Sequence, residues 1–225
     1  MHLRPRRRRF GGRPGTFTDM RTIEVFADVL CPFTHVGLRT LVDRRNRSGR
    51  TEPRLRIRAW PLELINGKPL DPHHVDAEIV ALRAAVRPDL FTGLSVETFP
   101  TTSMAAYALT AAADRTGDPV LGEEVGLAVR HVLFEEGLDI GRSEIVAQIA
   151  DRFGLKALDG KATSAAVEAD WAEGRARGVI GSPHFLTEDG GSWFCPSLAI
   201  SRDDVGNFVV AWKTDSEAFV ESVFG

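Results

Sequence analysis

The chain contains only two cysteines, Cys31 and Cys195, among its 225 residues. A small secreted scaffold held together by disulfides needs several cysteine pairs, so that class is excluded. No apolar stretch approaches the roughly eighteen residues of a membrane-spanning helix. No apolar segment follows the basic N-terminus either, so that end does not have the form of a secretory signal. These absences predict a globular protein located in the cytoplasm.

Basic residues are concentrated at the start of the chain. Residues 1–20 hold six arginines and one aspartate, a charge of +5, so the rest carries −8 where the whole chain carries −3. A basic tail of this kind either binds nucleic acid or anionic membranes or is a disordered leader. Because the rest of the chain is acidic, we expect a disordered leader and neither nucleic acid nor membrane as a partner.

The first part of the chain shows a strand, a helix and a second strand. Residues 23–30 are rich in β-branched side chains and predict a strand, and a helix should follow from Pro32 to about residue 46. Residues 55–60 alternate apolar and basic side chains, as expected for a strand with one wet face. This order predicts a βαβ unit.

The middle of the chain shows almost only helical signals, and strand signals return near the end. Helices are predicted over residues 73–86, 104–115, 121–134, 143–153 and 165–177. Two strands, 184–187 and 192–195, flank a good hairpin turn, and residues 216–224 predict a closing helix. The pattern therefore predicts an α/β fold with a mixed sheet: a βαβ half, a large helical insert and a ββα half.

Cys31 lies between the first predicted strand and the helix that begins at Pro32. The first helical position tolerates proline because its N–H has no partner within the helix. A cysteine at this turn faces free N–H donors and the positive end of the helix dipole, and both favour thiolate over thiol. The alternative is an inert cysteine that acts as a small buried hydrophobic residue. The strand–Cys–Pro–helix context favours a reactive thiol.

A second motif precedes the predicted hairpin. Pro183 directly before a strand either marks an ordinary turn or forms a cis peptide bond, and the nearby Gly178 and Gly181 suit a tight cis turn. Such a turn leaves the backbone of Ser182 free to hold an extended, thiol-bearing ligand beside Cys31.

The two motifs together resemble a known superfamily. Residues 28–33, Asp-Val-Leu-Cys-Pro-Phe, and residues 178–183, Gly-Val-Ile-Gly-Ser-Pro, resemble the DsbA-like thioredoxin superfamily with an inserted helical domain. The similar branch is that of the FrnE-type oxidoreductases, related to kappa-class glutathione transferases and 2-hydroxychromene-2-carboxylate isomerases. The resemblance covers residues 22–213. It implies a thioredoxin fold in which Cys31 is the nucleophile and Pro183 is the cis-proline.

The resemblance also implies the domains and the partners. Residues 22–62 and 176–225 would form the thioredoxin-like domain, and residues 63–175 the helical insertion domain. The expected substrate is a small-molecule or protein thiol or disulfide, with glutathione or another low-molecular-weight thiol as co-substrate. No tightly bound cofactor is expected, and homodimerisation is left open.

The chain departs from the FrnE-type pattern Cys-Pro-x-Cys because its second motif position is Thr34. Threonine cannot attack a mixed disulfide, so exchange between two cysteines of the motif is excluded. Its hydroxyl is instead expected to donate a hydrogen bond to the Cys31 thiolate and to lower the thiol pKa. The hairpin register places Cys195 at the Pro183 end of the sheet, as either a resolving or a buried structural cysteine.

Six further residues are candidates for binding substrate or thiol: Asp28, Pro32, Phe33, His35, Ser182 and His184. Asp28 either tunes the thiol or is a solvated charge at a strand end. His35 either stabilises the thiolate or packs against the insert. His184 either lines the ligand groove or is a partly buried strand histidine.

The sequence does not support a metal site. His73 and His74 lie near Asp71 and Asp76, but adjacent histidines on a helix point about 100° apart and chelate poorly.

Three functions remain open. The first is a thiol-dependent oxidoreductase in which Cys31 forms a mixed disulfide that an external thiol resolves. The second is a glutathione-type transferase or isomerase, whose related branch carries serine at the position of Cys31. The third is a non-catalytic thioredoxin-fold binding module. The cysteine at position 31 favours the first.

Overall fold

A computed structural model describes residues 20–225 of the protein. The prediction of a disordered leader therefore falls, but for Met20, outside the described residues. The elements follow in the order β1 (Thr22–Ala27), α1 (Pro32–Arg47), β2 (Arg54–Ala59), α2 (Leu62–Ile65), α3 (Pro72–Ala85), η2 (Val96–Thr98), α4 (Met104–Asp114), α5 (Pro119–Phe134), α6 (Ser143–Phe153), α7 (Gly160–Ala176), β3 (His184–Leu186), β4 (Ser192–Phe194), β5 (Leu198–Arg202), β6 (Phe208–Trp212) and α8 (Glu217–Phe224). Among the described helices, none is long and apolar enough to cross a membrane.

The central sheet is mixed, as the sequence predicts. Its four strands lie in the order β2-β1-β3-β4. β1 and β2 are parallel, whereas β3 runs antiparallel to β1 and β4 antiparallel to β3. Pairing of Phe26 with His184 brings the start of β3 beside the end of β1, which leads into Cys31. The sheet thus brings together two motifs that lie about 150 residues apart in the chain.

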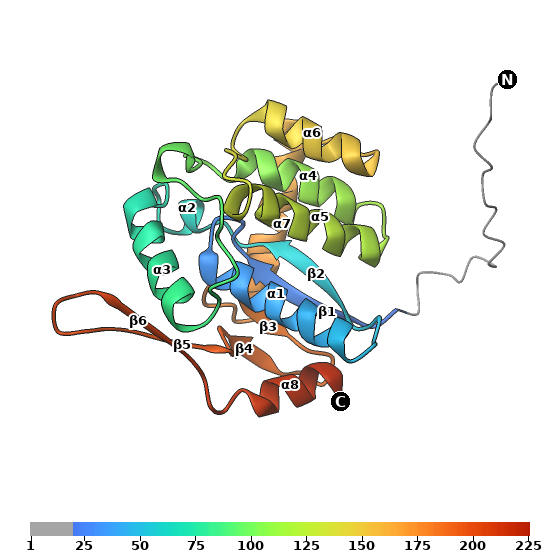
Figure 1. Cartoon of the computed structure of the whole chain (residues 1–225). Helices are drawn as coiled ribbons and strands as arrows, with labels where there is room; N and C mark the ends of the chain where they lie inside the picture. The colour runs from blue at the N-terminus through green and yellow to red at the C-terminus, as the bar shows by residue number, and fades with distance from the viewer. Residues whose placement is uncertain (1–19) are drawn as a thin grey trace, which may run out of the picture.

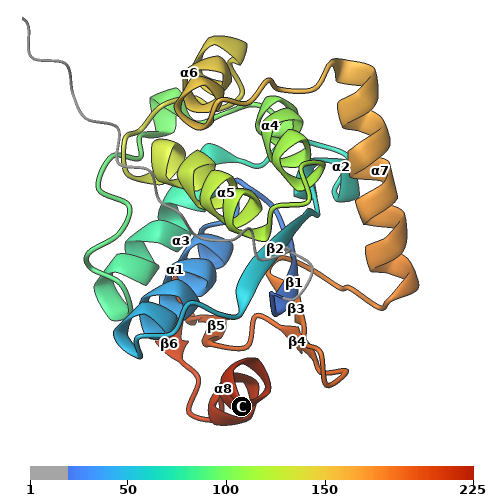
Figure 2. The same ribbon diagram turned by 90° about the vertical axis from the view of Figure 1, so that its right-hand side faces the viewer.

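Different helices cover the two faces of the sheet (Figures 1 and 2). Side chains alternate along a strand, so Ile23 points to one face, where it packs in a cluster with Leu41 of α1 and Phe219 of α8. Phe26 points to the other face, in a cluster to which Trp171 of α7 adds. The sheet is therefore the middle layer between α1 and α8 on one side and α7 on the other.

The helices that follow β2 form the insert: α5 packs along β2, α4 and α6 lie against α5, and α3 lies beside α1 (Figure 1). The largest apolar cluster joins Leu30 and Val36, on either side of Cys31, to Leu109 of α4 and Val129 of α5. The insert and the start of α1 thus share one core. The division into two domains stays a prediction.

A buried carboxylate ties the insert to the sheet. Glu123 of α5 accepts hydrogen bonds from Arg45 of α1 at 2.6 Å, from Arg54 of β2 at 2.9 Å and from the backbone N–H of Leu55 at 2.8 Å. Glu123 is 1 % exposed and Arg45 is 4 % exposed. Buried charges are tolerated when they are paired and hydrogen-bonded in this way.

The predicted helices are found, and their ends follow local signals. Aspartates cap α3 and α5 directly before a proline: Asp71 accepts from the N–H of His73, and Asp118 from that of Val120. Gly154 ends α6 with φ 64°. α7 begins at Gly160 rather than at the predicted residue 165, because Asp159 caps it through the N–H of Ala162.

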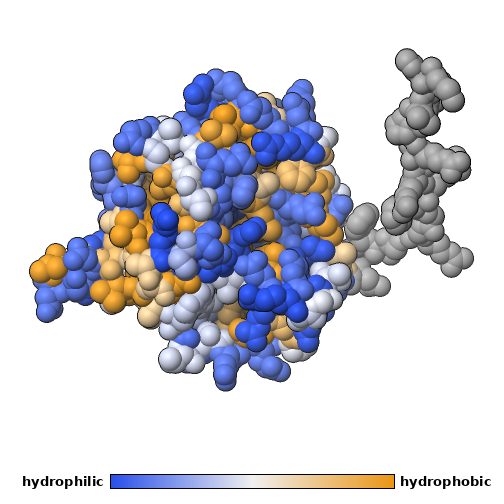
Figure 3. Space-filling view, in the orientation of Figure 1, coloured by the Kyte–Doolittle hydropathy of each residue, from blue (hydrophilic) through white to orange (hydrophobic). Residues whose placement is uncertain are grey.

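The sequence did not predict the two-stranded hairpin of β5 and β6. It forms a separate sheet that projects from the body of the molecule, with apolar groups on its surface in Figure 3. The hairpin lies against α3 near its turn, where the rings of Phe208 and His74 are 5.1 Å apart. Val205 in its turn is 82 % exposed. The hairpin therefore packs on α3 and exposes its turn to solvent.

Candidate active site

Cys31 occupies the N-cap position of α1, directly after the loop that follows β1. Its side chain is buried, and its thiol donates a hydrogen bond to the backbone carbonyl of Ser182 at 3.4 Å. The peptide bond between Ser182 and Pro183 is cis, as is that between Glu52 and Pro53. The two sequence motifs therefore meet, and Ser182 contacts the cysteine as expected from its place before Pro183.

A short network of hydrogen bonds fixes this contact. The hydroxyl of Ser182 accepts the backbone N–H of Asp28 at 2.8 Å and shares a hydrogen bond with the hydroxyl of Thr34 at 2.7 Å. Thr34, at the place of a second motif cysteine, is fully buried. The hydrogen bond between Thr34 and Ser182 thus joins the first turn of α1 to the segment before β3, next to the contact of the Cys31 thiol with Ser182.

The protonation state of Cys31 differs from the expectation. Burial raises the pKa of the Cys31 thiol to about 12, and hydrogen bonding from Thr34 lowers it only in part. Ionised Glu78 and Asp28 raise the pKa further by charge repulsion. The expected lowering of the thiol pKa is therefore not found: Cys31 lies at the N-cap of α1, but its burial outweighs that position and favours the thiol.

Asp28 is buried, and its carboxylate has hydrogen-bond partners. It is fully buried, and its carboxylate accepts the backbone N–H groups of Leu30 at 2.6 Å and Leu62 at 2.5 Å. Burial raises the pKa of Asp28 to about 6, against those two hydrogen bonds, which lower it. The alternative of a solvated strand-end charge was wrong, and Asp28 holds the loop before Cys31 against the start of the insert.

A pocket of about 500 Å³ opens beside Cys31, and we call it the Cys31 pocket. Its walls come from the first residues of α1, parts of the segment 62–71, one face of α3, residues 181–182 and Phe194. Of the predicted site residues, the lining includes Cys31, Pro32, Phe33 and Ser182. The volume is in the range of pockets that take small molecules.

The model of the DSBA-like thioredoxin domain matches residues 22–204. The chain belongs to the DsbA-like thioredoxin domain family. No curated protein matches its sequence.

Solved structures share the fold of this DsbA-like domain. The cytosolic disulfide reductase DsbM from Pseudomonas aeruginosa is 16 % identical with a TM-score of 0.55, over 89 % of this chain and 97 % of its own. DsbM has also been solved with GSH, and that structure is 18 % identical with a TM-score of 0.55, over 77 % of this chain and 89 % of its own. A 2-hydroxychromene-2-carboxylate isomerase is 14 % identical with a TM-score of 0.53, over 77 % of this chain and 88 % of its own. Such low identities show a common fold; the relation to kappa-class glutathione transferases stays a prediction.

The two candidate histidines of the DsbA-like domain lie outside the lining of the Cys31 pocket. The Nε2 atom of His35 lies 2.8 Å from Glu135, and its ring packs against Phe91 and Phe134 of the insert. Burial raises the pKa of Glu135, but hydrogen bonds, above all the one from His35, outweigh it and lower the pKa to about 2. Of the two alternatives, packing against the insert is the one found for His35.

His184 lies within the sheet, where it is 3 % exposed. Its Nδ1 accepts the backbone N–H of Ile180 at 3.3 Å, so the neutral ring carries its proton on Nε2, which donates to Ser192 at 2.8 Å. Burial lowers the pKa of His184. The structure thus agrees with a buried strand histidine rather than with a groove residue.

Cys195 lies where the register predicts, opposite Pro183, and its backbone N–H donates to the Pro183 carbonyl at 2.9 Å. It has a positive φ of 41°. Both cysteines are free and buried and belong to one apolar cluster, but Cys195 does not line the Cys31 pocket. Burial raises the pKa of Cys195 to about 11. A resolving role for Cys195 stays a prediction.

The insert supplies hydrogen-bond donors to the end of β1. Tyr107 of α4 donates to the carbonyl of Ala27 at 3.3 Å, and Arg130 of α5 donates to the carbonyl of Asp28 at 3.2 Å. Both side chains are buried, and within residues 20–225 no carboxylate lies within ion-pair distance of Arg130. Sequence reasoning missed both residues, because each lies on an apolar helix and only the packing of that helix on β1 gives it a role.

Sequence reasoning also missed Glu78 of the pocket wall and considered its neighbour His74 only as a metal ligand. They lie four positions apart on α3, with His74 Nε2 3.5 Å from the Glu78 carboxylate. Within residues 20–225 no three His, Cys, Asp or Glu side chains gather as metal ligands. The i, i+4 spacing on a helix was the available signal.

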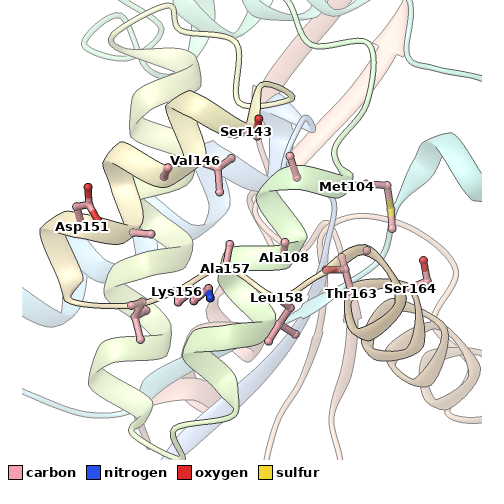
Figure 4. Close-up of a pocket in the computed structure, with 15 residues that line it drawn as sticks. Met104, Ala108, Ser143, Val146, Asp151, Lys156, Ala157, Leu158, Thr163 and Ser164 are labelled. Atoms are coloured by element: carbon pink, nitrogen blue, oxygen red, sulfur yellow. The ribbon is translucent and has the colours of Figure 1, made fainter.

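A second cavity, of about 560 Å³, lies in the insert between α4, α6 and α7 (Figure 4). Its lining is mostly apolar and includes Met104, Val146 and Leu158, with the exposed Asp151 and Lys156 among its polar residues. Cys31 is not part of it. Of the two pockets, Cys31 lines the first.

Proposed function

We propose that the protein is a thiol-dependent oxidoreductase that uses a single cysteine, Cys31, and an external low-molecular-weight thiol such as glutathione. The observation that carries this proposal is the cysteine itself. It caps α1, touches the backbone before Pro183 and lines a pocket of small-molecule size. Thr34 takes the place of a second thiol, and Cys195 does not reach the pocket lining.

The proposed reaction has two exchange steps. The Cys31 thiolate attacks one sulfur of a disulfide RS–SR′, forms Cys31–S–SR and releases R′S⁻. An external thiolate GS⁻ then attacks the R sulfur of the mixed disulfide, forms GS–SR and returns the Cys31 thiolate. The net change oxidises the external thiol and reduces the R′ sulfur. The N–H groups at the start of α1 stabilise the leaving thiolate of Cys31 in the second step.

The burial of Cys31 supports a second candidate, a thioredoxin-fold binding module without turnover. A thiol whose pKa burial raises to about 12 is a poor nucleophile. The two candidates differ in what a ligand does. An oxidoreductase must admit a disulfide to the sulfur, whereas a binding module leaves Cys31 unmodified.

The first experiment is incubation with glutathione disulfide followed by intact mass, with Cys195→Ser and Cys31→Ser as matched variants. One glutathione adduct in wild type and Cys195→Ser, absent from Cys31→Ser, supports the single-cysteine mechanism. If the wild type, but not Cys195→Ser, replaces that adduct by an internal disulfide, Cys195 is the resolving residue. No adduct on Cys31, together with no reduction of 2-hydroxyethyl disulfide by glutathione, favours the binding module.

A transferase or isomerase predicts a different outcome. Such an enzyme would bind glutathione without forming an adduct and would keep its activity in Cys31→Ser. We also propose a cytoplasmic location, which cell fractionation tests, and a thiol or disulfide, small or on a protein, as substrate. Homodimerisation is tested by the mass of the protein in solution.

A further inference from the structure

Glu78 is the most sheltered carboxylate among the acidic residues that line the Cys31 pocket. Its side chain is 13 % exposed, although it lies on α3 among residues that mostly face water. The other acidic residue of the lining, Asp71, is exposed and already accepts the N–H of His73 as the cap of α3. Glu78 has one ion-pair neighbour, His74, at a long 3.5 Å.

The charges that face Glu78 come from three directions. On its own helix His74 is half-exposed, and from β5 the guanidinium of Arg202 lowers the pKa of Glu78 by its charge. Across the pocket stands the Cys31 thiol, on which Glu78 acts as a like charge. Lys68 also lines the pocket, but it is exposed, so water and salt screen its charge.

Burial outweighs Arg202 and raises the pKa of Glu78 to about 7. Glu78 and Cys31 are therefore two acids in one pocket, and the negative charge of the first opposes ionisation of the second. A proton on Glu78 removes this opposition, and so does a positive charge held beside its carboxylate.

Resting on the proposed function, we propose that Glu78 adds to the effect of burial in keeping Cys31 protonated, and that a positive charge on the disulfide substrate, held beside the Glu78 carboxylate, makes the thiol easier to ionise. Cys31 then loses its proton to water, and its thiolate attacks the bound disulfide. The substrate class that this selects is a small disulfide with an ammonium or guanidinium group near its sulfurs. In this role Glu78 is a specificity-determining residue that acts through charge and forms no bond to the reacting sulfur.

The first test measures alkylation of Cys31 by iodoacetamide against pH, with all proteins in a Cys195→Ser background. Glu78→Gln is expected to react about tenfold faster than its parent at pH 8.5, since removal of a nearby like charge lowers a pKa by about one unit or more. The advantage should shrink towards one at pH 5.5, where Glu78 of the parent is itself protonated. Asp76→Asn removes the same charge from α3 outside the pocket lining and should match the parent throughout.

Each other result overturns the proposal. An equal acceleration at every pH means that the substitution opened the pocket, and no acceleration means that the two acids are not coupled. Slower alkylation of Glu78→Gln makes Glu78 a base that helps to form the thiolate. Circular dichroism checks that the variant is folded.

The second test uses the wild-type protein alone, so it does not depend on how a variant folds. The rate of mixed-disulfide formation is compared for cystamine, 2-hydroxyethyl disulfide and 3,3′-dithiodipropionate, which are similar in length and carry positive, zero and negative charge. Cystamine is expected to react fastest and the dianion slowest. An equal or reversed order refutes the charge selection, whereas failure of all three to modify Cys31 refutes the proposed function itself.

Discussion

Replacing Asp28 with asparagine is expected to stabilise the protein at neutral pH and not in mild acid. Asp28 is fully buried; its carboxylate accepts hydrogen bonds from two backbone N–H groups, and the charge of the buried Arg130 also lowers its pKa. Burial raises the pKa of Asp28 from 3.8 to about 6. The folded protein therefore holds this proton more tightly than the unfolded chain does.

The shift sets the size and the sign of the effect. About two pKa units correspond to about 3 kcal/mol. Because the pKa is raised on folding, this stabilisation is fully present below pH 3.8 and is lost as the pH rises through about 6. Asparagine, like the protonated carboxyl, stays neutral at every pH. The free energy of unfolding of Asp28→Asn minus that of wild type should therefore rise by about 3 kcal/mol between pH 4 and pH 7.5.

Urea unfolding followed by tryptophan fluorescence, at half-unit pH steps, measures this difference. Asp204→Asn is the control, because Asp204 lies exposed in the turn of the β5–β6 hairpin. A difference between Asp28→Asn and wild type that does not change with pH would refute the reasoning. It would mean that the two backbone N–H groups stabilise the carboxylate as well as water does.

Two further substitutions test the packing that supports the site. Glu123→Ala should lower the free energy of unfolding by about 3–5 kcal/mol in urea titrations, because it leaves a buried arginine unpaired, while the exposed neighbour Glu124→Ala should change it by less than about 0.5 kcal/mol. Gly174→Ala should cost about 1–3 kcal/mol, since its Cβ would lie 2.6 Å from the ring of Trp60. Gly122→Ala, also within a helix but with nothing within 4 Å of its Cβ, should instead stabilise by up to about 1 kcal/mol, and an equal effect at both glycines would contradict the contact.

Much of the fold follows from local signals in the sequence. The helices of the insert are marked by their own caps, prolines and glycines, so their ends can be read without knowing what they pack against. The β5–β6 hairpin lacks such a signal. Its turn, Asp203 to Asn207, resembles any polar loop, and its strands form where they lie against α3, a contact that depends on the tertiary structure.

The sequence predicted which residues lie close together at the site, but it did not predict the pKa of the thiol. The order of elements places Cys31, Ser182 and Pro183 together because the sheet topology does so. The thiol pKa depends on how completely the insert covers the sulfur, and no local pattern contains that information. Glu78 was missed for the same reason. A glutamate four positions after a histidine on an amphipathic helix resembles a solvated charge, and only the packing of α3 in the folded protein shows that Glu78 faces the pocket.

The hydrogen bonds from Tyr107 and Arg130 to the end of β1 have a consequence for protein engineering. Exchanging helical inserts between relatives is an obvious way to transplant substrate preference onto a common thioredoxin scaffold. In this chain the insert is also the partner of the carbonyls that precede the nucleophile. A chimera that lacks both donors would take the Arg130 partner from the Asp28 carbonyl in a closed core and leave the Ala27 carbonyl with the backbone N–H of Trp60, so a graft has to carry the two residues with it.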